Sequence, residues 1–403
     1  MLVPDDTKPK EKKKTYGGMA VVEGVMMRSP NHYSVACRAP NGAIVVKTEH
    51  IEKTWIGRQK WLMKPFLRGT FALLDTMGLG MRAMNFASEV QLDEKYQPEE
   101  DEAVQTEKNT DGQPTDEQKE TFWSRLKARM QKGYERNRAF WDKAILGATI
   151  VISLAMGFAL FQATPQFIAE LVVRLFSGGA GIAETNEHLT LTNIVAEVVK
   201  LSFFIGYVSL IRLYPAIMDV FRYHGAEHQA INAMEEGVEL TPENCLRQTR
   251  LHPRCGTNFA ILVFLVGFML FPFIPRDLIV PADSHWLLLG LTRVPVELAL
   301  LPIIAGISYE IIRIAGKFKN EAWVNVLLWP GLKTQLITTA VPEARHAEVA
   351  ISSLEAAVLA EETGELTNSE DYTPVSLRGG EEPEAPDQGV EPSAEEARLA
   401  NEI

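Results

Sequence analysis

Four stretches of the chain are apolar over the length that a helix needs to cross a lipid bilayer. They cover residues 143–163, 194–214, 257–274 and 286–312, and few charged residues interrupt them. A hydrocarbon core of about 30 Å takes roughly 20 helical residues. The pattern predicts a mainly α membrane protein with about four transmembrane helices. The alternative for the same runs is a large helical core buried inside a soluble protein.

Alternating apolar and polar positions before the first run predict a small β unit over 16–57. The segments SVACRAP and AIVVKTEHI flank Asn41 and Gly42. This pair accepts the positive φ angles of a two-residue hairpin turn. The glycines of the preceding segment YGGMAVVEG either mark turns or let the backbone approach another group closely.

Helical periodicity predicts amphipathic helices on both sides of the apolar runs. Residues 58–88 contain too many charges for a span, and they suit a pair of helices lying on the cytoplasmic face of a bilayer. Residues 337–362 have apolar positions at helical spacing, which predicts a last helix that docks on the rest of the protein.

The segment between the second and third apolar runs predicts a helix, a turn and a second, short helix. The second run is expected to continue as one helix through PAIMDVFRYHGAEHQAINAMEE, with Gly237 as its C-cap. Thr241 and Pro242 then supply the N-cap and the first residue of a helix over 242–250.

Charge separates a basic body from two acidic appendages. The net charge is −12, yet residues 89–120 hold 12 acidic and 3 basic side chains, and residues 343–403 hold 16 acidic and 3 basic ones. The remainder is therefore basic. Acidic segments of this kind bury too little apolar surface to offset chain entropy, so we expect a disordered linker and a disordered tail.

The basic residues also predict the orientation of the spans. Lysine and arginine cluster before the first run, between the second and third, and after the fourth, whereas 164–193 and 275–285 hold one arginine each. The positive-inside rule then places both termini and the 215–256 loop in the cytoplasm. The three cysteines lie in these cytoplasmic segments without C-x-x-C spacing, which agrees with a reducing compartment. The charged N-terminus lacks the apolar core of a signal peptide.

The candidate chemistry lies in this cytoplasmic loop. His224 and His228 are four residues apart in HGAEH, so on a helix their imidazoles share one face. Two nitrogens at this separation can bind one Zn²⁺ ion. His252 and Cys255 follow in LHPRCG, where proline and glycine favour a turn. We therefore expect Zn²⁺, or another divalent transition metal, at this loop.

Two kinds of metal site are compatible with these residues. If His224, His228, His252 and Cys255 all bind, the site is closed and structural. If three bind and water takes the fourth position, Glu227 is the general base of a hydrolase. A third interpretation has these histidines and nearby arginines contacting lipid headgroups without a metal.

The order of residues in the motif indicates a carboxylate as a further candidate metal ligand. His-x-x-Glu-His matches the inverted zincin arrangement, in which a glutamate from farther along the chain completes the ligands. Glu310, near the cytoplasmic end of the fourth run, is the candidate for this ligand. The simpler role for Glu310 is an ion pair with Arg313.

Two more candidates lie in the glycine-bracketed segment. Glu23 and Arg28 either belong to a functional site or are surface groups. The segment lacks the Lys-Ser/Thr ending of a phosphate-binding loop. A transporter fits poorly, because the spans hold few charges and show no inverted repeat.

Three motifs together, GGMAVVEGVMMRSP, FRYHGAEHQAIN and LHPRCGTNF, resemble the YqhQ-like family of bacterial membrane proteins, a domain of unknown function. SYEIIRIAGK and PGLKTQLITTAVPE resemble the C-terminal part of the same family. The resemblance covers most of 16–355 outside the acidic insert. It implies a multi-spanning protein of the bacterial cytoplasmic membrane and a predicted metal-dependent enzyme whose reaction is not settled.

These inferences combine into one expected organisation. The N-terminal part is expected to hold a disordered basic tail at 1–15, a β-containing cytoplasmic unit at 16–57, interfacial helices at 58–88 and an acidic linker at 89–120. A four-span membrane domain follows at 121–336, and its 215–256 loop carries the metal residues. The chain is expected to end with an amphipathic helix at 337–362 and a disordered acidic tail at 363–403. The expected partners are the lipid bilayer and a membrane-protein or peptide substrate, with no nucleic acid. The expected function is a zinc-dependent membrane hydrolase of the peptidase type. The alternative is a non-enzymatic membrane assembly or scaffold protein with a structural zinc.

Overall fold

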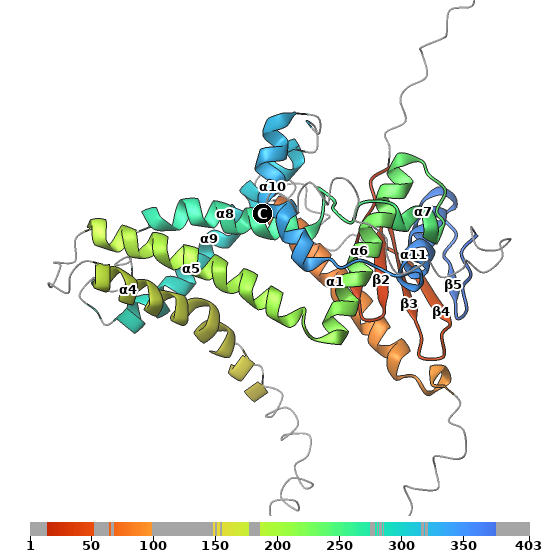
Figure 1. Ribbon diagram of the computed structural model, residues 1–403, viewed down its shortest axis with the longest axis horizontal. Helices are drawn as coiled ribbons and strands as arrows, with labels where there is room; N and C mark the ends of the chain where they lie inside the picture. Colours follow the sequence, from red (N-terminus) through yellow and green to blue (C-terminus); the bar gives the residue numbers. More distant parts are fainter. Residues whose placement is uncertain are drawn as a thin grey trace, which may run out of the picture. The chain divides into compact units, whose positions relative to one another are not determined.

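The chain folds into helices and one antiparallel sheet, seen here in a computed structural model (Figure 1). The structure describes residues 14–51, 64–65, 68–98, 148–149, 151–153, 155–176, 186–274, 279, 281, 284, 286–315, 318 and 321–375. Most of the predicted basic tail and acidic linker, and the tail beyond 375, lie outside the described residues. One compact unit comprises Met1–Gln97, Phe204–Phe271 and Pro295–Ile403, and a second comprises Pro98–Phe203 and Pro272–Val294.

Among the residues that the structure describes, three helical segments are long and apolar enough to cross a membrane: Val151–Val173, Leu191–Ile211 and Val294–Ala315. The second lies in α5 (Asn186–Ile211) and the third in α9 (Trp286–Ala315). They correspond to the first, second and fourth predicted runs.

The first of these segments extends ten residues beyond the predicted end at 163, whereas residues 143–147 of the predicted run lie outside the described residues. It continues through the π-helical turn η3 (Ala159–Ala163) into α4 (Thr164–Phe176). The π turn ends two residues before Pro165, whose missing N–H would interrupt a regular α-helix.

The third predicted run forms a shorter helix than expected. α8 (Gly256–Leu270) has 15 residues and passes into the 3₁₀ turn η4 (Phe271–Phe273). Pro272 lies in this turn and has no N–H group to donate to the carbonyl four residues earlier, so the α-helical bonding pattern ends there. α10 (Ala322–Thr338) packs on α8, where Gly331 approaches Asn258 so closely that an added Cβ would lie 2.1 Å from the Oδ1 atom of Asn258.

Five strands form the sheet in the order β1-β2-β3-β4-β5. Their bounds are β1 (Gly17–Val21), β2 (Gly24–Arg28), β3 (His32–Arg38), β4 (Ile44–His50) and β5 (Asn368–Ser369). The predicted hairpin is confirmed, since β3 pairs with β4. Its turn is longer than the two-residue turn expected, because residues 39–43 separate the paired residues Arg38 and Ile44, and of Asn41 and Gly42 only Gly42 has a positive φ, of +92°. The sheet extends beyond that hairpin, because β1 and β2 form a second one.

β5 shows that the predicted disorder from residue 363 onward is wrong for its first part. β5 pairs with β4, and the N–H group of Tyr372 donates to the carbonyl of Ile44 at 2.8 Å. The Tyr372 side chain is buried. Main-chain bonds to the free edge of β4 supply this order, and the acidic composition of the segment gives no sign of them.

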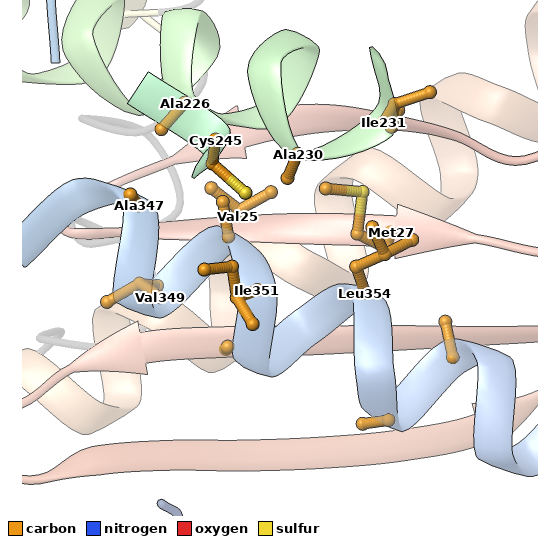
Figure 2. Packing of buried hydrophobic residues seen from close by; sticks show 14 of the residues in the cluster. Val25, Met27, Ala226, Ala230, Ile231, Cys245, Ala347, Val349, Ile351 and Leu354 are labelled. Carbon is orange, nitrogen blue, oxygen red and sulfur yellow. The ribbon is translucent and has the colours of Figure 1, made fainter. Parts of the chain in front are cut away.

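Side-chain alternation gives the sheet two apolar faces. Val25 and Met27 point toward a core shared with α6, α7 and α11, whereas Met26 points to the opposite face, which α1 covers. Figure 2 shows Val25 and Met27 beside Ile351 and Leu354 of α11. A period of two along each strand thus produces one layer of helices on each side of the sheet.

α1 (Arg68–Leu92) packs on the sheet and covers the second part of the predicted interfacial region 58–88. Residues 58–63, 66 and 67 of that region lie outside the described residues, so the predicted pair of helices stays a prediction. The buried side chains that face the sheet are Leu79, Ala83, Ala87 and Val90. The helix continues past the predicted start of the acidic linker at 89, and the 3₁₀ turn η2 (Glu94–Tyr96) follows it. Apolar residues at helical spacing therefore outweigh the acidic composition up to Tyr96, which is itself buried.

α6 (Pro215–Glu236) is separate from α5, so the predicted continuous helix is wrong at its first part. Pro215 occupies the first position of a new helix, where its missing N–H costs nothing. The predicted caps are confirmed: Gly237 adopts the left-handed conformation, and the Thr241 side chain accepts from Asn244 N–H at the start of α7 (Pro242–Leu246). α7 ends four residues earlier than predicted.

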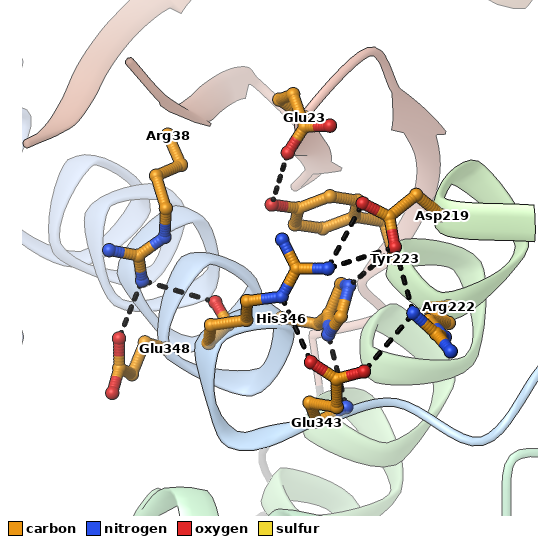
Figure 3. Close-up of polar contacts among 9 residues, drawn as sticks. Glu23, Arg38, Asp219, Arg222, Tyr223, Glu343, His346 and Glu348 are labelled. Carbon is orange, nitrogen blue, oxygen red and sulfur yellow. Dashed lines mark hydrogen bonds and ion pairs between the residues drawn. The ribbon is translucent and has the colours of Figure 1, made fainter. Parts of the chain in front are cut away.

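A polar network around the buried ring of His346 joins α6 to α11 (Ala344–Thr363), as Figure 3 shows. The ring of His346 lies edge-on to Tyr223 at 4.7 Å. Its Nε2 atom is 3.3 Å from Asp219, and its Nδ1 atom accepts from the N–H group of Glu343 at 3.0 Å. Arg345 also donates to Asp219, at 3.0 Å and 3.1 Å. His346 is therefore held as a neutral ring with a defined tautomer.

Lowering the pH from 7 to 5 is expected to destabilise the fold through His346. Burial, and then the charge of Arg345, lower the pKa of His346 to about 4 from its usual 6.5. The unfolded chain binds a proton near pH 6.5, whereas the folded chain does not until about pH 4. This contribution is therefore fully present above pH 6.5 and is lost as the pH falls toward 4.

The measurement is the thermal unfolding midpoint at pH 7 and pH 5 for the wild type and for His346→Gln. An amide keeps one acceptor and one donor at this position but does not titrate. We expect a smaller drop in the midpoint for His346→Gln, while the exposed His50→Gln control follows the wild type. Equal drops in all three proteins would contradict the role of His346.

Candidate metal centre

Two histidines of α6 present their Nε2 atoms to one point. His224 and His228 lie one helical turn apart, with ring centroids separated by 4.5 Å. The Nδ1 atom of His224 is 3.0 Å from the carbonyl oxygen of Thr338, and that of His228 is 2.5 Å from the carbonyl oxygen of Arg250. Main-chain carbonyls thus fix both rings through Nδ1, an arrangement typical of metal-binding histidines.

Cys255 supplies a thiol at the same point. It is the N-cap residue of α8, and its Sγ atom lies 3.2 Å from Nε2 of His224. The ligand atoms of His224, His228 and Cys255 all lie within 4.8 Å of one another. Zn²⁺ binds imidazole nitrogen at about 2.0–2.1 Å and thiolate sulfur at about 2.3 Å, so one ion can reach all three.

The Nε2 atom of His228 provides a further test of whether these residues fit a metal. This atom is buried and has no hydrogen-bond partner within the described ranges. Leaving such a nitrogen unbonded costs free energy, and a metal bond removes that cost. Two nitrogens and one sulfur also form a donor set that zinc favours. The residues therefore fit a zinc ion.

Glu227 lies beside this triad. One of its carboxylate oxygens is 3.9 Å from Nε2 of His224 and 3.7 Å from Nε2 of His228. Burial raises the pKa of Glu227 to about 7, and the charge of His224 and a hydrogen bond from the N–H group of Gly18 oppose this rise. Glu227 is a buried carboxyl group beside the Nε2 atoms that would bind a metal. It is therefore placed to exchange a proton with a water molecule on that metal.

Gly18 of β1 belongs to the site, and the sequence motif around the histidines gave no sign of it. A Cβ atom at this position would lie 3.0 Å from the Glu227 side chain and 2.5 Å from the carbonyl oxygen of Met26. The close backbone approach proposed for the glycine-bracketed segment is therefore found at Gly18. The paired glycines of YGGM were the available signal.

His252 lies next to the triad, outside the group of three ligand atoms. Its ring centroid is 5.6 Å from that of His228. Its main-chain N–H donates to Gln335 at 2.8 Å, and its carbonyl accepts from Gln335 at 2.8 Å and from Asn258 at 3.3 Å. These bonds hold the LHPRCG turn against α8 and α10. Ligation by His252 stays a prediction.

Glu310 is engaged elsewhere. Its carboxylate accepts two hydrogen bonds from the guanidinium group of Arg68 at the start of α1, one of them at 2.7 Å. Arg313, the partner expected from the sequence, lies at 3.9 Å. Glu310 is not one of the grouped ligand atoms within the described residues. Its role as a ligand also stays a prediction.

Glu23 and Arg28 connect the β1–β2 hairpin to its neighbours. Glu23 adopts a φ of +48°, which is uncommon for a non-glycine residue, and its carboxylate accepts from the hydroxyl of Tyr223 at 3.2 Å. Arg28 donates to Asp75 of α1 at 3.1 Å. Tyr223 directly precedes His224, so the Glu23 bond places the hairpin alongside the helix that carries the histidines.

Comparison with known proteins gives relatives without an assigned reaction. A family described as Protein of unknown function (DUF1385) matches residues 64–360. The Uncharacterized protein YqhQ of Bacillus subtilis (strain 168) is 33% identical over 344 residues, which is 84% of this chain and 90% of that protein. No solved structure matches the chain.

Proposed function

The chain belongs to the YqhQ-like family DUF1385, whose description assigns no reaction, and from its own residues we propose that it is a zinc-dependent membrane hydrolase that cleaves peptide bonds. One observation carries the proposal. The buried carboxylate of Glu227 lies 3.9 Å from Nε2 of His224 and 3.7 Å from Nε2 of His228. The ligand atoms of these two histidines and of Cys255 form one cluster. Three ligands and an adjacent carboxylate are the parts that a hydrolytic zinc site requires.

The residues have separate roles in this reaction. His224, His228 and Cys255 would hold the ion. When bound, the ion would polarise the peptide carbonyl and lower the pKa of a water molecule. Glu227 takes a proton from the attacking water as the water oxygen bonds to the peptide carbonyl carbon. The C–N bond then breaks, and Glu227 passes the proton to the leaving amine nitrogen. The products are a carboxylate and an amine. Gly18 holds the Glu227 carboxylate in place through its N–H group.

The membrane location is part of the proposal. In the described ranges, three helices have the length and apolarity of a membrane span, and we propose the shorter apolar α8 as the fourth. Glu197 and Lys200 of α5 are both buried and pair at 3.1 Å, which reduces the cost of charges within an apolar helix. The distribution of lysine and arginine supports cytoplasmic termini and a cytoplasmic metal centre in a bacterial inner membrane.

A second function is supported by the thiol of Cys255 and by the burial of His228. Thiolate ligands are frequent in closed, structural zinc sites. In that case His252 would be the fourth ligand, and the protein would be a membrane scaffold whose zinc joins the 215–256 loop to α8. The two functions differ in whether His252 is needed for metal binding.

Metal content per chain, measured on the purified full chain in detergent, tests both functions. We expect about one zinc in the wild type and in His252→Ala, and a large loss in His228→Ala and in Cys255→Ser. The exposed residue His50 serves as a matched control, so His50→Ala should keep its zinc.

The outcomes separate the possibilities. Loss of zinc in His252→Ala would favour the closed, structural site over the hydrolase. Loss in His228→Ala alone would place Cys255 outside the ligand set. A wild type without stoichiometric metal would overturn both functions and leave the histidines as an interfacial cluster.

A further inference from the structure

α10 packs against α8 and the end of α9 with one of its faces. This contact is an apolar cluster, and its buried members are Leu262, Ala315, Val324 and Leu328. α8 and α9 are the third and fourth spans of the proposed membrane domain. The inner face of α10 therefore continues the packing of two membrane-spanning helices.

The opposite face of α10 is apolar as well, but it is exposed. Trp323, Val326 and Trp329 are three residues apart in turn, so they share one side of the helix. Their exposed fractions are 47%, 74% and 43%. Phe318, which is also exposed, extends this surface, with its ring centroid 5.9 Å from that of Trp323. We call Trp323, Val326 and Trp329 the aromatic face of α10; the described residues leave it accessible.

The chemistry of the aromatic face matches the boundary between lipid and water. Tryptophan combines a large apolar ring with an N–H donor, and it is enriched where membrane proteins cross the headgroup region. Lys333 follows Trp329 by one helical turn, and its ammonium nitrogen is 5.4 Å from the centroid of that ring. This nitrogen has no hydrogen-bond partner within the described ranges. A lipid phosphate is an acceptor that a flexible lysine side chain can reach at this boundary.

The length and direction of α10 favour a position along the membrane surface. Its 17 residues extend about 26 Å, which is less than the hydrocarbon core of about 30 Å, and Pro330 interrupts its hydrogen bonding. In Figure 1, α10 runs across α8, with which it is in contact, and not alongside it. If α8 crosses the bilayer, α10 lies in the plane of the headgroups, as an interfacial helix does.

The last turns of α10 hold the metal centre. The carbonyl oxygen of Thr338 is 3.0 Å from Nδ1 of His224. Gln335 accepts from the N–H group of His252 and donates to its carbonyl oxygen, both at 2.8 Å. Thr338 follows Trp329 by nine residues, which is about 14 Å along a helix. The depth of α10 in the membrane therefore sets the depth of the metal centre.

We propose that the aromatic face of α10 binds the headgroup region of the lipid bilayer and thereby holds the metal centre at the membrane surface. The bilayer is the occupant because the other face of the same helix packs on α8 and α9, and because tryptophan and lysine together suit this boundary. At this depth the proposed hydrolase would meet peptide segments next to the membrane. The inference rests on the proposed membrane location of α8 and α9, and it does not require a particular metal.

The test measures the depth of single labelled positions in the full chain, reconstituted in vesicles of phosphatidylcholine and phosphatidylglycerol. Val326→Cys is labelled with the fluorophore NBD, and Trp323→Cys provides a second position on the same face. The native cysteines are buried, and the unsubstituted chain treated in the same way gives the background. Three quenchers are compared: a nitroxide on the lipid headgroup, a nitroxide near the end of the acyl chain, and iodide in the water.

We expect the headgroup nitroxide to quench Val326→Cys about twofold or more strongly than either of the other quenchers, because the headgroups and the centre of the bilayer are well separated. Leu298→Cys is the reference for hydrocarbon, since Leu298 is 62% exposed on the span in α9. His50→Cys is the reference for water, since His50 is exposed on β4. The acyl-chain nitroxide should quench the first reference most, and iodide the second.

A label at Val341 reports the depth of the metal centre. Val341 is exposed and follows Thr338 by three residues. We expect both the headgroup nitroxide and iodide to quench Val341→Cys, because this position lies at the water side of the headgroups. Quenching of Val341→Cys by iodide alone would place the metal centre away from the membrane surface and would overturn that part of the proposal.

The references separate failure of the inference from failure of the proposed function. Val326→Cys that follows His50→Cys would place the aromatic face in water, and Val326→Cys that follows Leu298→Cys would place it in hydrocarbon; each result overturns the proposal. Shielding of Val326→Cys from all three quenchers would show that protein, such as a second copy, covers the face, and would also overturn it. Quenching of Leu298→Cys by iodide alone would instead refute the membrane location itself. A chain that holds no zinc but shows the expected depths refutes the hydrolase and leaves α10 as a bilayer-binding helix.

Discussion

Replacement of Glu227 with glutamine is expected to abolish hydrolysis while zinc stays bound. Glutamine keeps the size of the side chain and an oxygen that can accept from Gly18, so the centre should retain its shape. It cannot take a proton from water at neutral pH. Removal of a general base costs about 10²–10⁴-fold in rate. The measurement is the rate at which the purified chain produces new amino termini from unlabelled Ser-Val-Ala-Val-Ala-Val-Ser, together with zinc content.

Glu236→Gln is the matched control, because Glu236 lies at the exposed end of the same helix. It should keep both activity and zinc. Unchanged activity in Glu227→Gln would exclude Glu227 as the base and favour the scaffold function. Loss of zinc in Glu227→Gln would instead identify Glu227 as a ligand, and the proposed division of roles would fail.

Truncation of Leu354 to alanine is expected to produce a large loss of stability. Leu354 of α11 is fully buried in the core that α11 shares with β2 and α6, close to Met27 and Ile351 (Figure 2). Removal of a buried leucine side chain typically costs about 2–5 kcal/mol, because a cavity remains in addition to the lost burial. The measurement is the free energy of unfolding of the full chain in urea.

The expected loss depends on burial, so a leucine of the same helix serves as the control. Leu359 is 39% exposed, and Leu359→Ala should cost much less. Since α6 carries the two histidines and belongs to the same core, Leu354→Ala should also weaken zinc binding. A similar cost for both substitutions would show that α11 does not hold this core together.

The parts of the fold that were predictable depend on residues close together in the chain. Gly42 marks the hairpin between β3 and β4, Gly237 and Thr241 specify helix ends, and the four-residue spacing of His224 and His228 places both rings on one helical face. Each of these features follows from backbone conformation within a few residues. A sequence contains that information directly.

The parts that were missed depend on contacts between distant segments. Gly18 contacts Glu227 more than two hundred residues away, and Arg68 occupies the carboxylate of Glu310. β5 adds to an edge made by the N-terminal strands. The packing of the sheet and the helices decides which distant residues form such pairs. A local sequence pattern does not show which distant carboxylate or strand edge is the partner.

The packing of α11 on the N-terminal strands has a consequence for synthesis of the protein. A ribosome completes β2 more than three hundred residues before it completes α11, and all three candidate spans are made in between. At about 5–20 residues per second, the apolar sheet face that α11 covers stays uncovered for roughly 15–60 s. The core between the sheet and α11 can therefore form only after the three apolar helical segments have been synthesised.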